Sequence, residues 1–192
     1  MSTWVILRSA GVGAYLMLFM SIAWGLVATS GALGPRVSKA SAVSIHRFFS
    51  VAGLLLLGIH IGGLLIDPFM PFDASEILVP GAASYRPAAT AFGVIAMYAT
   101  VVVLVTSWLR KRIGTTWWRR MHLLAVPTFA LSLAHGIFSG TDSARPWMWW
   151  MYLVTGGVVV FLVVLRGLTA GYRPDRAARQ VMTEPVNMHA PR

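Results

Sequence analysis

The sequence contains no cysteine among its 192 residues. Without thiols the chain can form no disulfide, iron–sulfur cluster or thiolate nucleophile, and it cannot attach a c-type haem covalently. Acidic residues are also scarce: there are six, against sixteen lysines and arginines. Neither a G-x-G-x-x-G nor a G-x-x-x-x-G-K-[ST] motif occurs, so we expect no flavin or NAD site in this chain.

Charged residues of either sign are rare, at 11%, whereas 57% of the residues are hydrophobic and the mean hydropathy is +0.69. A bilayer core of about 30 Å needs roughly 20 apolar residues in helical form. Five uncharged runs approach or exceed that length: Ser9–Pro35, Phe48–Ile66, Pro87–Leu109, Met121–Thr141 and Pro146–Leu165. The sequence therefore predicts an all-α membrane protein, a bundle of five transmembrane helices.

Positive charges gather on one side of these predicted spans. Thirteen lysines and arginines fall on the side of the loop around Arg36, and only Arg8, Arg86 and Arg145 fall on the other. This bias predicts a multi-pass protein of the cell membrane with its N-terminus outside and its C-terminus cytoplasmic. We expect the basic side to meet anionic lipid headgroups, not nucleic acid. Residues 1–166 form the predicted membrane domain, and residues 167–192 form a polar cytoplasmic tail.

Four histidines lie within or at the edge of the second and fourth predicted spans. His46 and His60 are fourteen residues apart, and His122 and His135 are thirteen apart. Each pair covers roughly 20 Å of helix rise, and the two spans run in the same direction. His46 should therefore match His122 in depth on the inner side, and His60 should match His135 on the outer side. Ionisable groups inside a membrane are costly and point to function.

Haem suits two facing imidazoles, because its iron accepts one axial nitrogen from each side. Zinc would require four ligands, and the spans contain no cysteine, aspartate or glutamate. A proton relay would usually include buried carboxylates, and the sequence predicts none. A single histidine could simply form an interhelical hydrogen bond.

Further residues are candidates for a haem site. Gly53 lies midway between His46 and His60 on one helix face, where a haem edge could approach; a plain helix contact is the alternative. Next to the inner histidines, Arg47, Arg119 and Arg120 could bind haem propionates, or contact lipid headgroups instead.

One geometric difficulty concerns the fourth span. On a straight helix His122 and His135 would point about 140° apart. We expect Pro127, between them, to kink the helix.

Two loops are unusual in composition. The outer segment Asp67–Arg86 has three prolines and three acids, which fits a structured cap, a mobile loop or a lid over an outward site. The inner segment "RKRIGTTWWRRMH" mixes five cations with two tryptophans, which is typical of anchoring at a lipid interface.

Over about residues 4–166, these features resemble the ferric reductase-like transmembrane family, which includes the membrane part of NADPH oxidases and the haem-binding subunit of the periplasmic methionine sulfoxide reductase. The resemblance rests on H-x13-H in one span, H-x12-H two spans later, the basic segment before the second pair, and "HGIFSGTD". It implies that His46 and His122 ligate an inner b-type haem and that His60 and His135 ligate an outer one. Two haems are expected, although one is possible. Many members have six spans and a flavin- and nicotinamide-binding part, neither of which is evident here.

The resemblance implies transmembrane electron transfer, with this chain as the electron-transfer subunit of an oxidoreductase. Electrons would come from a cytoplasmic flavoprotein dehydrogenase or from quinol, and would leave to an outward acceptor or partner protein. The alternatives are a quinone-linked cytochrome b subunit of another family, whose paired histidines are typically equally spaced, and a haem-free membrane scaffold or transporter.

Overall fold

The computed structural model describes residues 3–30 and 37–170. In these ranges helices are the only regular secondary structure and no strand is present: α1 Thr3–Ser30, α2 Lys39–Ile66, α3 Ala74–Leu78, α4 Pro87–Trp108, α5 Arg110–His122, α6 Ala125–Ser139 and α7 Pro146–Ala170. Helices α1, α2, α4 and α7 are long and apolar enough to cross a membrane, and α5 with α6 adds a fifth if the bent pair is one span. The all-α prediction is confirmed, with four or five candidate spans.

Two helices reach well beyond the uncharged runs. α2 begins at Lys39, where the side chain of Ser38 caps it by accepting a hydrogen bond from the Ser41 N–H at 3.0 Å. α7 likewise continues past residue 166 to Ala170, and the rest of the expected tail lies outside the described residues.

The fourth predicted span, Met121–Thr141, is not one continuous helix. α5 ends at His122, α6 begins at Ala125, and their axes differ by 41°. The break falls four residues before Pro127, whose ring would clash with the carbonyl of Leu123 in a continuous helix. The basic inner segment is itself helical, with a kink at Gly114, whose φ of 80° favours glycine.

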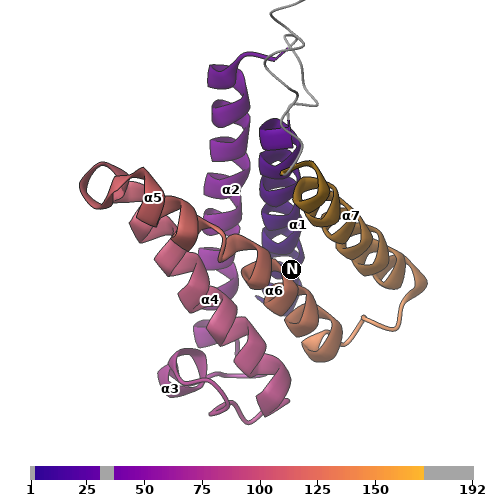
Figure 1. Cartoon of the computed structure of the whole chain (residues 1–192). Coiled ribbons are helices and arrows are strands. Elements are labelled where there is room, and N and C mark those ends of the chain that lie inside the picture. The colour runs from indigo at the N-terminus through magenta and orange to yellow at the C-terminus, as the bar shows by residue number, and fades with distance from the viewer. Residues whose placement is uncertain (1–2, 31–36, 171–192) are drawn as a thin grey trace, which may run out of the picture.

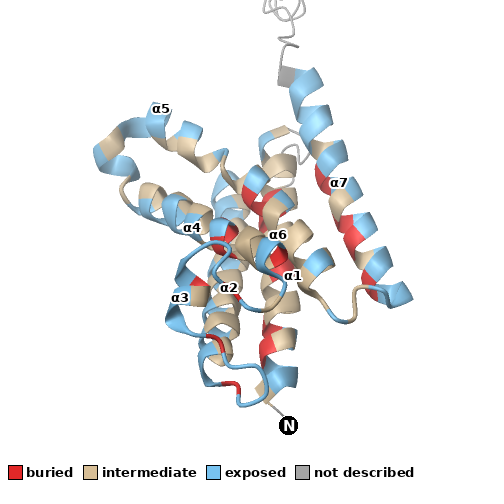
Figure 2. Cartoon of the chain, turned by 90° about the horizontal axis from the view of Figure 1, so that it is seen from below, coloured by how far each residue is buried: buried red, intermediate tan, exposed pale blue. Residues whose placement is uncertain are grey.

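α1 lies at the centre of the bundle and packs against α2, α6 and α7, whereas α4 packs on α6 (Figure 1). Among the described helices α2 makes extensive close contact only with α1. The main core joins Tyr15 and Ile22 of α1 to Phe129 of α6 and to Met148, Tyr152 and Val159 of α7. Figure 2 shows buried residues on α1, α6 and one side of α7, and none on α5. The core thus lies on one side of α1, and α2 lies on the other.

The segment Asp67–Arg86, on the side that is predicted to be outer, is a structured cap with a small core of its own. Phe72, Ile77 and Ala83 pack together beside the outer end of α2. A hydroxyl of the cap, on Tyr85, donates to the carbonyl of Ser139 at 3.1 Å. The cap therefore connects the end of α2 to the end of α6.

Candidate functional site

The four membrane histidines meet in the two pairs that their depths predict. The ring centres of His46 and His122 lie 6.0 Å apart, and those of His60 and His135 lie 6.5 Å apart. The ring planes cross at 69° in the inner pair and 71° in the outer pair. α2 supplies one histidine to each pair, and the break between α5 and α6 lets both other histidines face it.

These separations suit two imidazoles that share one metal ion. Transition-metal ions such as zinc bind an imidazole nitrogen at about 2.0–2.1 Å. With about 1.1 Å more from that nitrogen to the ring centre, two rings on opposite sides of a metal have centres about 6.2–6.4 Å apart. Nowhere in the described ranges do three or more His, Cys, Asp or Glu side chains gather as a metal site. Paired imidazoles alone suit a metal whose other ligands come from a planar macrocycle.

Three of the four rings are held by a hydrogen bond to the backbone of a neighbouring helix. The Nδ1 atom of His60 lies 2.8 Å from the carbonyl oxygen of Leu7, and that of His135 lies 3.0 Å from Ala89. The Nδ1 atom of His46 lies 3.0 Å from the carbonyl oxygen of Ser21. A carbonyl only accepts, so Nδ1 carries the proton and the neutral ring keeps the Nε2 lone pair free for a metal.

A glycine lies four residues after each of these carbonyls. A Cβ at Gly11 would be 2.9 Å from the Nδ1 of His60, and one at Gly93 would be 2.7 Å from the Nδ1 of His135. At Gly25 the corresponding distance to His46 is 3.6 Å. We call each carbonyl–glycine pair a cradle, because the carbonyl accepts the ring N–H and the missing side chain leaves room for the ring.

The cradles were not among the predicted site residues. A signal was present: Gly11 and Gly25 are fourteen residues apart, the same spacing as His46 and His60 on the helix that runs antiparallel to α1. Two antiparallel helices with equal spacings can place both glycines against both histidines.

His122 is the exception. Its Nδ1 atom is buried and has no hydrogen-bond partner among the described residues. Its ring instead packs against the indole of Trp118, with ring centres 5.1 Å apart and planes tilted by 30°. The fourth ring is therefore held by an aromatic contact and not by a cradle.

A cavity of about 1130 Å³ runs through the bundle and is lined by all four histidines. It separates α2 from α4 and α6, which explains why α2 packs extensively on α1 alone. Ligand pockets commonly measure 300–1,000 Å³. The cavity is slightly larger than that range, and both histidine pairs lie on its wall.

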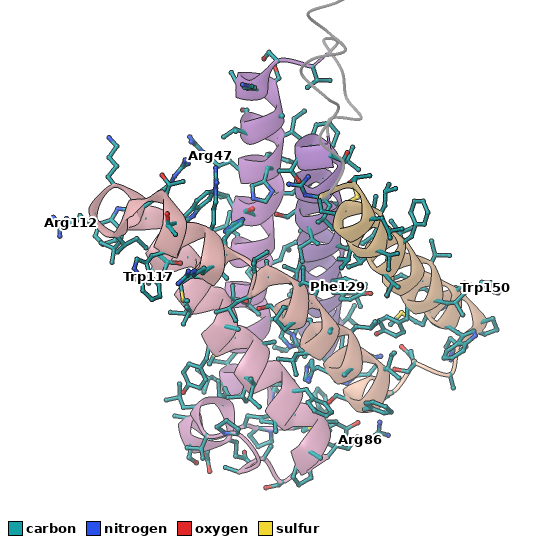
Figure 3. All side chains as sticks on the ribbon, in the orientation of Figure 1. Arg47, Arg86, Arg112, Trp117, Phe129 and Trp150 are labelled. Atoms are coloured by element: carbon teal, nitrogen blue, oxygen red, sulfur yellow. The ribbon has the colours of Figure 1, made fainter. Side chains whose placement is uncertain are left out.

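The predicted basic residues of the inner side do not all face this cavity. Arg47 and Arg119 line it, and Figure 3 shows Arg47 in the space between α2 and α5. The guanidinium of Arg120 lies 5.2 Å from the ring centre of Trp117 instead. Arg110, which was not predicted, lines the cavity and stacks 4.2 Å over Trp118.

Gly53 lines the cavity, but its closest neighbours belong to α1. A Cβ at Gly53 would lie 3.2 Å from the Cβ of Met17. This contact favours the helix-packing interpretation over the approach of a haem edge.

Phe129 is 3% exposed and stacks on Tyr15 in the main core (Figure 3).

At the outer end, the arginines already have partners. Arg8 forms a 2.8 Å ion pair with Asp142, and Arg86 donates to the carbonyl of Phe138 at 2.6 Å. The expectation that no carboxylate is buried is wrong, because Asp67 directly after α2 is 2% exposed and lines the cavity. Its Oδ1 atom has no hydrogen-bond partner in the described chain. Asp67 directly follows the uncharged run Phe48–Ile66, and the composition of that run does not indicate that the cap folds this residue inward.

No protein-family model, curated protein or solved structure matches this chain. A functional interpretation therefore depends on the geometry of the histidine pairs and the cavity.

Proposed function

We propose that this chain is the electron-transfer subunit of a membrane oxidoreductase and that it holds two b-type haems, one at each histidine pair. The observation that supports this most directly is the pairing itself. Two imidazoles face each other across a cavity at 6.0 Å and again at 6.5 Å, close to the separation that a shared metal requires. The resemblance of the histidine spacings to the ferric reductase-like family supports the same assignment.

The protein residues hold, orient and insulate the cofactor. Hydrogen bonds from Nδ1 fix the tautomer and raise the basicity of the ligand nitrogen. When bound, haem would supply a reversible one-electron iron couple, and the two imidazoles of each pair would leave no iron position open to oxygen. The apolar walls of the cavity lower the dielectric around the charge on the iron, and burial is one of the factors that set its potential.

The charge distribution gives the proposed direction. With the basic side in the cytoplasm, His46 and His122 are the inner pair, and electrons enter there from a flavoprotein dehydrogenase or from quinol. They leave past His60 and His135 to an outward acceptor or partner protein. Arg47, Arg119 and Arg110 line the inner cavity, so they are the groups available to pair with inner haem propionates.

The first test is a dithionite-reduced minus oxidised spectrum of protein purified after haem-replete expression, with haem quantified per chain. We expect b-type bands and two haems per chain. No haem in a folded, monodisperse preparation would overturn the proposal.

Four single substitutions test the pairing. His46→Ala and His122→Ala should each remove the same haem, and His60→Ala and His135→Ala should each remove the other. His189→Ala, in the tail that the sequence predicts to be polar, should keep both and serves as the matched control. Haem content unaffected by any of the four substitutions would contradict the assignment.

Electron transfer itself can be measured in vesicles that enclose ferricyanide. A membrane-impermeant reductant added outside should bleach the trapped ferricyanide only when the wild-type chain is present. Both His46→Ala and His60→Ala should stop the bleaching, since each interrupts the route at a different depth. Equal bleaching by wild type and variants would show that electrons do not pass through the histidine pairs.

A further inference from the structure

The cradles on α1 and α4 follow one pattern, and its fourth position is altered. On α1, the glycines that face His60 and His46 are Gly11 and Gly25, fourteen residues apart. On α4, Gly93 faces His135, and the residue fourteen positions further along is Ser107. The inner cradle of α4 thus has a serine where the other three have glycine.

Ser107 and Trp118 together fill this altered position. The carbonyl four residues before Ser107 belongs to Val103, and the hydroxyl of Ser107 itself donates to it at 2.6 Å. The indole N–H of Trp118 in turn donates to the hydroxyl oxygen of Ser107 at 3.3 Å. The Val103 carbonyl therefore already accepts a side-chain hydrogen bond, and the indole of Trp118 lies between α4 and His122.

This arrangement explains why the Nδ1 of His122 has no partner. The ring lies against Trp118 with centres 5.1 Å apart, and Arg110 lies 4.2 Å over the same indole. The stacked indole restrains the tilt of the His122 ring, but it accepts no hydrogen bond from the Nδ1 at the edge of that ring. Removal of the hydrogen-bond partner of a ligating histidine typically costs 10–100-fold in metal affinity.

We infer that Trp118 is the positioning residue of His122, in place of a backbone hydrogen bond, and that the inner histidine pair consequently releases haem more readily than the outer pair. This inference rests on the proposed function, because it concerns the same four ligands. It gives the two sites different roles: the outer haem is the permanent one, and occupancy of the inner site depends on Trp118.

Haem transfer from the wild-type protein to an excess of apomyoglobin tests the difference between the pairs. We expect two phases of loss, with the faster at least about tenfold faster than the slower, as the missing hydrogen bond implies. The fast phase should be absent in His46→Ala, which lacks the inner haem, and should remain in His60→Ala. A single phase, or a fast phase that disappears in His60→Ala, would overturn the inference.

Substitutions of the adjacent tryptophans test the role of Trp118. Trp118→Leu removes the ring and should leave one haem per chain, whereas Trp118→Phe keeps a stacking ring and should restore two. Trp117→Leu is the matched control: Trp117 is 58% exposed and contacts Arg120, so both haems should stay. Retention of the outer-haem spectrum in Trp118→Leu shows that the bundle has folded.

The outcomes separate this inference from the proposed function. A wild-type protein without haem would refute both. Two firmly held haems in wild type and in Trp118→Leu would refute both the faster release from the inner pair and the role of Trp118, and would leave the proposed function standing. If Trp118→Leu lost both haems, Trp118→Phe would decide the role of Trp118: two haems in that variant would support the role, and loss of the inner haem would refute it.

Discussion

At the scale of single residues, the absence of a Cβ at Gly93 lets the Nδ1 of His135 reach the carbonyl of Ala89. An alanine there would place a methyl group 2.7 Å from the Nδ1 of His135, closer than van der Waals contact allows. We expect Gly93→Ala to push the ring away and to remove the outer haem, with the inner haem retained. Haem per chain and the loss of one component from the difference spectrum measure this result.

Gly25 provides the matched control within the same kind of cradle. A Cβ at this position would lie 3.6 Å from the Nδ1 of His46, which is an ordinary contact. Gly25→Ala should therefore keep both haems and should not weaken the helix, because alanine is favoured over glycine in a helix interior by about 1 kcal/mol. Equal haem loss in the two variants would show that the cradles do not position the histidines.

The angle between paired rings makes a prediction about electron paramagnetic resonance. Both pairs cross at close to a right angle, 69° and 71°. Near-perpendicular axial imidazoles on ferric low-spin haem give a strongly anisotropic signal with a large highest g value, whereas parallel rings give a well-resolved rhombic signal. We expect the first type for both haems in the oxidised protein. A rhombic spectrum from both sites would contradict the ring orientations.

At the scale of elements, the break between α5 and α6 allows both of their histidines to face α2. In one straight helix, His122 and His135 would point about 140° apart, and only one could line the cavity. Pro127 prevents such a helix, because its ring cannot coexist with the helical carbonyl of Leu123.

Replacement of this proline should therefore change haem stoichiometry. We expect Pro127→Ala to let the helix continue across Leu123 and to reduce bound haem from two per chain to one. Pro146→Ala is the control, since Pro146 is the first residue of α7, where proline and alanine are both tolerated. If Pro127→Ala retained two haems, packing of α6 on α4 would suffice to hold the bend.

Within the outer cap, the carboxylate of Glu76 joins the short helix α3 to Ser84. Glu76 accepts hydrogen bonds from the Ser84 hydroxyl and the Ser84 N–H, each at 2.6 Å, and from the Asp73 N–H at 3.0 Å. The Ser84 hydroxyl is the largest cause that holds the pKa of Glu76 below its ordinary value of 4.5. The ionised carboxylate of Glu76 therefore stabilises the cap fully above pH 4.5. This contribution is lost as the pH falls through the lower pKa that Glu76 has in the folded protein.

Comparison with Glu76→Gln at equal pH removes the intrinsic pH dependence of amide exchange. At pH 7 the cap amides of the variant should exchange faster than those of the wild type. As the pH falls below 4.5 and through the lower pKa of the folded state, the ratio should approach one, because protonated Glu76 resembles glutamine. A constant ratio across this range would show that ionisation of Glu76 does not hold the cap.

At the scale of the whole molecule, spacing within one helix was predictable and contacts between helices were not. The depths of His46 and His60 follow from rise per residue, which is why the two pairs could be predicted. The segment Arg110–His122 was predicted to be a loop because its five cations interrupt the apolar runs, whereas the structure shows it as α5. The roles of Gly11 and Gly93 depend on which helix faces which histidine, and the unpartnered Nδ1 of His122 depends on a tryptophan that seemed to be a lipid anchor.

The orientation in the membrane is the last prediction, and the lack of cysteine makes it directly testable. If the basic side is cytoplasmic, the cap lies outside and α5 lies inside. Ser75→Cys is exposed in the cap, and Thr115→Cys is exposed on α5. In intact cells a membrane-impermeant maleimide should label Ser75→Cys alone, and permeabilised cells should show both labelled. The unmodified chain gives no background, since it has no thiol. Labelling of Thr115→Cys alone in intact cells would reverse the proposed direction of electron flow while leaving the histidine pairs unchanged.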